Sequence, residues 1–145
     1  MSGGIFVVQP TGALVEMAPE PYDAEAVLQK LLADYPGLLG GSSTEGEARR
    51  WLLVRREVGV PDGDSGAARW SVDHVFLDHE GVPTIVEVKR SSDSGIRRAV
   101  VGQMLDYAAN ISAYLPADAM RRTFVERCEK AGLDPEQEIT ALLGP

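Results

Sequence analysis

The sequence has little cysteine and no long apolar run, and each absence excludes a class of protein. Its single cysteine, Cys128, cannot form an internal disulfide, which fits a reducing compartment. No apolar run approaches the roughly 20 residues that span a bilayer. The first residues, Met1 to Gly4, lack the basic stretch and apolar core of a secretory signal. We therefore expect a cytoplasmic protein with no membrane partner.

Positive charge is also scarce, although its distribution matters more than its total. The 145 residues include 14 Lys and Arg against 22 Asp and Glu, a net charge of −8. Nucleic-acid-binding proteins usually have a basic surface, so the total first argues against one. However, residues 49–98 hold nine basic and eight acidic residues, and the acidic excess lies on either side of them. A local phosphate-binding patch is therefore still compatible with the sequence.

The composition that remains, 44% hydrophobic and 25% charged, is typical of one soluble globular domain. Periodicity and turn residues predict a small hairpin, a helix, three strands, a long helix and a helical tail. The long helix should present Val100, Met104 and Ala108 to the sheet. The predicted segments, in order, are 4–8, 13–17, 23–35, 50–60, 70–78, 82–90, 96–114 and 117–145.

The third strand carries charged residues where burial is expected. Glu87 and Lys89 alternate with Val86 and Val88, and burying such charges costs several kcal/mol unless each is paired or bound to a metal. The short turn after the second strand centres the hairpin on residue 80, which places Asp73 nearly opposite Glu87. Two carboxylates at that separation repel, and a divalent cation between them would relieve the repulsion.

The long helix adds Gln103 and Tyr107, four residues apart on one face and beside its apolar stripe. A glutamine at a core-facing position needs a hydrogen-bond partner. The cluster around Asp73 and Glu87, or a bound phosphate, could supply that partner.

Asp73, the run Glu87-Val88-Lys89 and the helical Gln103-x-x-x-Tyr107, in this order, resemble the PD-(D/E)XK nuclease superfamily, in particular its RecB-like and NucS-like endonucleases. The resemblance covers about residues 22–110. It implies a three-layer α/β/α restriction-endonuclease-like core with a mixed, mostly antiparallel central sheet. The family core has another strand after the Gln-x-x-x-Tyr helix. This sequence departs from that pattern, because the segment that follows reads as a helical C-terminal tail, an extra element beside the core.

The resemblance also implies roles. The chain would be an endonuclease, a hydrolase that cleaves DNA phosphodiester bonds with Mg²⁺ or Mn²⁺. Lys89 would orient or help deprotonate the attacking water, and Gln103 and Tyr107 would position the DNA backbone or support the metal shell. The implied metal ligands are Asp73, Glu87, the carbonyl of Val88 and an extra acid on the first helix, for which Glu25 is the candidate. The candidate nucleic-acid contacts are Arg90, Arg97 and Arg98.

Each of these residues has a structural alternative. Glu87 and Lys89 could form a surface ion pair on an edge strand, and Asp73 could accept a hydrogen bond at a strand end. Gln103 and Tyr107 could make an ordinary helix–sheet contact, and Glu25 could favour the helix dipole. His74 and His79 are expected to be structural or exposed, and Cys128 to lie in the core.

We expect a single nuclease-like domain with a core over about residues 22–114, an N-terminal hairpin at 1–17 and a helical tail at 117–145, which could be the start of a longer chain. The alternative function is a non-catalytic module that keeps the nuclease scaffold to bind nucleic acid or protein. Because the chain is acidic, binding to DNA should be weak and salt-sensitive, with added affinity from a homodimer or from a further region.

Overall fold

A computed structural model describes residues 4–18, 24–43, 45–61, 68–90 and 96–144 of the chain. The protein is mixed α/β, with α-helices and small antiparallel sheets. The strands are β1 (Ile5–Val8), β2 (Leu14–Met17), β3 (Trp51–Pro61), β4 (Ala68–Asp78) and β5 (Pro83–Val86). The helices are α1 (Glu25–Asp34), the 3₁₀ turn η1 (Pro36–Leu39), α2 (Ile96–Tyr114), α3 (Ala117–Ala131) and α4 (Pro135–Leu143).

The central sheet has the order β3-β4-β5, and both pairings are antiparallel. The predicted hairpin register is confirmed, because His74 pairs with Val86 and Val75 with Ile85. The predicted third strand is too long, however, since β5 ends at Val86. The reason is a contact with the neighbouring strand: the backbone N–H of Val88 donates to the Asp73 carboxylate instead of continuing the ladder. The expectation of a mixed sheet is also wrong for the described residues, whose strand pairs are all antiparallel.

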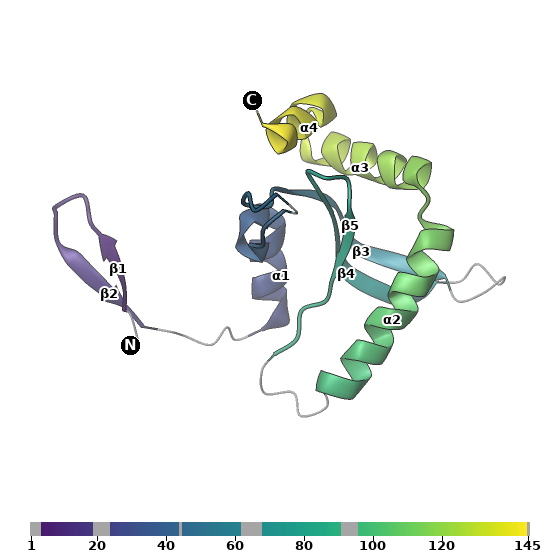
Figure 1. Cartoon of the computed structure of the whole chain (residues 1–145), viewed down its shortest axis with the longest axis horizontal. Helices are drawn as coiled ribbons and strands as arrows, with labels where there is room; N and C mark the ends of the chain where they lie inside the picture. Colours follow the sequence, from purple (N-terminus) through teal and green to yellow (C-terminus); the bar gives the residue numbers. More distant parts are fainter. Residues whose placement is uncertain (1–3, 19–23, 44, 62–67, 91–95, 145) are drawn as a thin grey trace.

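Helices cover both faces of the central sheet, with α1 on one face and α2 and α3 on the other (Figure 1). The alternation of side chains along the strands explains this arrangement, because successive residues point to opposite faces. On the α1 side, Leu53 and Phe76 pack with Leu32. On the other side, Val54 and Val75 pack with residues of α3 and α4.

The helical tail is part of the core. Phe124 and Cys128 of α3 and Leu142 of α4 are buried against β3 and β4, as the spacing of the predicted tail stripe indicates. The predicted N-cap of the last helix is confirmed, because Asp134 accepts hydrogen bonds from the N–H groups of Glu136 and Gln137. Residues beyond 117 thus supply three of the seven buried residues of this cluster.

The prediction for the first helix needs one adjustment, since it begins at Glu25 after Ala24. The predicted cap, Asp23, lies outside the described residues. Along α2, Ala108 is exposed and Tyr107 is buried against Val72. One residue turns a helix by about 100°, so turning Tyr107 inward places Ala108 toward solvent.

The hairpin of β1 and β2 forms its own two-stranded sheet, apart from the other elements (Figure 1). Its strand residues are all exposed, including the large apolar side chains of Ile5, Phe6 and Leu14. No helix in the described part of the chain is long and apolar enough to cross a membrane.

Candidate functional site

Three separate segments bring charged residues together at the end of β5. Asp73 lies in β4, Glu87 to Lys89 follow β5, and Glu25 is the first residue of α1. The Lys89 ammonium lies 2.7 Å from Glu87 Oε1 and 3.9 Å from Glu25 Oε2. The second oxygen of Glu25 accepts from the N–H of Arg90 at 3.1 Å. We refer to Glu25, Asp73, Glu87 and Lys89 as the acidic cluster.

Glu87 has a buried side chain within the acidic cluster. Its side chain is only 5% exposed. Oε1 contacts Lys89, whereas Oε2 is buried without a hydrogen-bond partner among the described residues. A buried carboxylate oxygen with no donor costs about 1–3 kcal/mol or more. Burying the Glu87 carboxylate with one oxygen unsatisfied therefore destabilises the folded protein, and a bound cation would supply the missing partner.

Asp73 is fixed from the other strand of the hairpin. Its Oδ2 accepts from the Val88 N–H at 2.7 Å. In the β3–β4 ladder the pairs Arg56–His74 and Val58–Val72 flank Asp73 in constant register, which places Glu57 opposite it. The intervening residue, Glu57, has a φ of 51°, in the left-handed region that costs a non-glycine residue about 1 kcal/mol or more. Strained backbone of this kind is common beside functional sites.

The charges around Lys89 act together. The hydrogen bond to Glu87 raises the pKa of Lys89, and the negative charges of Glu87, Glu25 and Asp73 raise it further, against the opposing effect of burial. All three carboxylates therefore lie within electrostatic reach of one ammonium group. Their mutual repulsion is offset by this single cation.

Gln103 and Tyr107 interact with each other on α2, as their spacing predicts. Gln103 Nε2 donates to the Tyr107 hydroxyl, which in turn donates to the carbonyl of Ser71 at 3.1 Å. Tyr107 is 1% exposed and packs against Val72, the neighbour of Asp73. The pair therefore holds α2 to the part of β4 that carries Asp73, and no hydrogen bond joins it to the acidic cluster itself among the described residues.

The candidate nucleic-acid contacts are less well defined. Arg90 is exposed and follows the cluster directly. Arg97 and Arg98 lie in the first turn of α2, and the structure describes their backbone but not their side chains.

His74 is buried beside the cluster, which favours the structural role expected for it. Its ring stacks on Phe76 at 5.5 Å between centroids, and its Nε2 lies 2.7 Å from the carbonyl of Gln29 in α1. Burial lowers the pKa of His74, and the charge of Arg56 lowers it further, while the hydrogen bond to Gln29 and the charges of Asp73 and Glu87 raise it. The sequence signal for this burial was the alternation that groups His74 with Phe76.

The donors fit a cation that keeps part of its water shell. Asp73 and Glu87 offer carboxylate oxygens, and one of these is buried without a donor. Magnesium is commonly held by one or two carboxylates together with waters and substrate phosphates. A closed cage does not fit, because the described residues contain no group of three or more His, Cys, Asp or Glu side chains arranged to hold a metal.

Comparison with protein families, with curated proteins and with solved structures found no match for this chain.

Proposed function

We propose that this protein is a Mg²⁺- or Mn²⁺-dependent nuclease that hydrolyses DNA phosphodiester bonds at the acidic cluster. The observation that carries the proposal is the Glu87 carboxylate, 5% exposed, with one oxygen on Lys89 and the other without a partner in the described residues. A purely structural ion pair has no need for an unsatisfied buried oxygen, which is costly. In a metal-binding site, by contrast, the oxygen that lacks a hydrogen-bond donor would coordinate the cation.

The proposal includes a restriction-endonuclease-like arrangement. It is supported by an antiparallel hairpin that carries Asp73 on β4 and Glu87 just beyond β5, and by helices on both faces of that sheet (Figure 1). The PD-(D/E)XK resemblance of the sequence points to the same arrangement.

A bound Mg²⁺ or Mn²⁺ would act as a Lewis acid on the phosphate and would lower the pKa of a coordinated water. Asp73, Glu87 and the carbonyl of Val88 are the groups that would hold it. Lys89 presents its ammonium beside these oxygens, where it would orient the attacking water and stabilise negative charge on the phosphate. Glu25 restrains Lys89 and the backbone of Arg90, so it would position the cluster from α1.

DNA is the proposed partner, and self-association would add to its affinity. The exposed apolar side chains of the β1–β2 hairpin support a homodimer, because a lone two-stranded hairpin is only marginally stable in water. Sedimentation velocity of the full chain and of a Phe6→Ser variant would test this part of the proposal. A monomeric wild-type chain at micromolar concentration would contradict it.

The function is tested by incubating the protein with labelled single-stranded, double-stranded and branched DNA in Mg²⁺ or Mn²⁺. Wild-type protein should cleave at least one substrate, and chelation of the metal should stop the reaction. Glu87→Ala and Lys89→Ala should abolish cleavage. The matched controls Glu129→Ala and Lys30→Ala, on exposed helix positions, should not change it. Cleavage that survives the two cluster substitutions would refute the assignment of the site.

A non-catalytic module is the second candidate function. It is favoured by the hydrogen bond from Val88 to Asp73, the structural contact that a strand-end aspartate would make. The lack of a three-ligand group in the described part of the chain favours it as well. This candidate predicts DNA binding without cleavage and without stabilisation by Mn²⁺.

A further inference from the structure

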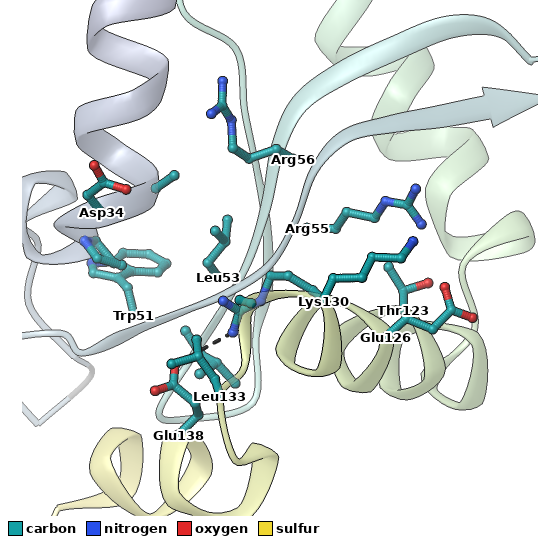
Figure 2. Close-up of a pocket in the computed structure, with 15 residues that line it drawn as sticks. Asp34, Trp51, Leu53, Arg55, Arg56, Thr123, Glu126, Lys130, Leu133 and Glu138 are labelled. Carbon is teal, nitrogen blue, oxygen red and sulfur yellow. Dashed lines mark ion pairs between the residues drawn. The ribbon is translucent and has the colours of Figure 1, made fainter.

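A second charged site lies at the opposite edge of the central sheet from β5. It is a cleft of about 680 Å³ beside β3, between α1 and the C-terminal half of α3. Four cations line it: Arg55 and Arg56 of β3, and Arg127 and Lys130 of α3. We refer to this feature as the β3-edge cleft; Figure 2 shows its lining side chains.

The arginines just before β3 differ in their contacts from the arginines within it. Arg49 pairs with Asp78 and Glu80 and donates to the carbonyl of Ser42. Arg50 donates to the carbonyls of Leu142 and Leu143 and so joins α4 to the sheet. Both are used by the fold itself.

Arg55 and Arg56 have no such partners in the part of the chain that the structure describes. No carboxylate in the described residues lies within ion-pair distance of Arg55, Arg56 or Lys130. Figure 2 shows the Arg55 and Lys130 side chains extending in the same direction along the cleft. Cations that line one cleft without a counter-charge repel one another, and a bound anion would reduce that repulsion.

The acids of the cleft do not supply this counter-charge. Asp34 pairs with Lys30, and Glu138 pairs with Arg127 at 3.6 Å. Among the described residues that line the cleft, Glu126 is the one acid left to oppose Arg55, Arg56 and Lys130. The cleft therefore has excess positive charge although the chain as a whole is acidic.

Two donors in the cleft are also unsatisfied. The Nε atoms of Arg56 and Arg127 are buried and have no hydrogen-bond partner among the described residues. A guanidinium presents a fork of donors that matches phosphate oxygens. Unsatisfied arginine donors in a cleft with excess positive charge are the arrangement expected of a phosphate-binding site.

The cleft is linked to the acidic cluster through β4. Arg56 pairs across the sheet with His74, which is adjacent to Asp73.

We propose that the β3-edge cleft binds backbone phosphates of the nucleic-acid substrate, away from the cleavage site, through Arg55, Arg56 and Lys130. This inference rests on the proposed nuclease function for the identity of the polyanion. The cleft would contribute affinity that does not depend on the nucleotide sequence, and the acidic cluster would cleave the phosphodiester bond.

The test uses the full chain in chelator, so that binding is measured without cleavage. Fluorescence anisotropy with a short labelled DNA would be recorded for wild type, for Arg55→Gln/Lys130→Gln and for the matched control Arg122→Gln on the exposed face of α3. The double variant should bind about tenfold more weakly. Its slope of log affinity against log salt should be smaller by about 1.5, because each phosphate contact contributes about 0.7 to 0.9. The control should match wild type.

The failure of this inference and the failure of the nuclease proposal can be told apart. If wild type cleaves DNA but the double variant binds it as well as the Arg122 control does, the cleft assignment is wrong and the nuclease proposal stands. A pyrophosphate titration followed by amide NMR shifts gives a second readout. If DNA is not cleaved but pyrophosphate shifts residues of the cleft in wild type only, the cleft is an anion site and the nuclease proposal fails. If neither DNA nor pyrophosphate binds, the cleft assignment is refuted.

Discussion

Replacing Asp73 by asparagine and by alanine should separate its structural role from its proposed metal-binding role. Asparagine keeps an oxygen that can accept from the Val88 N–H, which lies 2.7 Å from Asp73 Oδ2 in the structure. Exchanging a charge-assisted hydrogen bond for a neutral one costs about 1 kcal/mol. Alanine instead leaves the N–H of Val88, a residue 3% exposed, without an acceptor, which costs about 3 kcal/mol for the lost bond and the unsatisfied donor.

The measurement is urea unfolding in chelator, followed by circular dichroism. With a slope of about 1.5 kcal/mol per molar urea, the difference of about 2 kcal/mol between the two variants separates their midpoints by about 1.3 M. Equal losses in the two variants would show that the hydrogen bond is not what anchors Asp73.

The same unfolding curves in Mn²⁺ test the second role. A metal at ten times its dissociation constant stabilises the folded state by about 1.4 kcal/mol. Wild type should gain this stability, and Asp73→Asn should not, although its fold is nearly intact. If Mn²⁺ stabilises Asp73→Asn as much as wild type, Asp73 is not a metal ligand.

Three further predictions concern single residues. Glu57→Gly should raise the free energy of unfolding by about 0.5–1 kcal/mol, because it relieves a φ of 51°, and Glu57→Ala should not, as urea unfolding would show. Tyr107→Phe should lower that free energy by about 1 kcal/mol, because the carbonyl of Ser71 loses its donor, and a larger loss for the half-buried Gln103→Ala would contradict this. Burial raises the pKa of the Cys128 thiol, so a thiol reagent at pH 8 should react with Cys128 only as fast as the chain unfolds; rapid reaction of the folded protein would contradict its burial.

The hairpin that carries the candidate site was predictable because its register depends on few residues. A short turn at residues 79–81 fixes the pairing of β4 with β5, and a side-chain period of two then fixes which residues share a face. Glu25 lies seven residues before Leu32, so helical spacing alone turns it toward the sheet along with that buried leucine.

The remaining features depend on contacts that local patterns do not encode. Strand β5 ends early because the Asp73 side chain takes the N–H of Val88, a contact between residues far apart in sequence. The packing of Phe124 against the sheet, and the position of Lys130 in the same cleft as Arg55, depend on where α3 crosses β3. Amphipathic spacing predicts that a helix packs, but it does not predict against which strand.

The most direct test of the central claim is a Mn²⁺ titration followed by electron paramagnetic resonance, which detects the free ion. Wild type should bind Mn²⁺, Glu87→Gln should bind it at least tenfold more weakly, and the exposed control Glu129→Gln should match wild type. Wild-type protein that leaves all Mn²⁺ free at about millimolar concentration, or Glu87→Gln that binds as tightly as wild type, would contradict a metal site at Asp73 and Glu87.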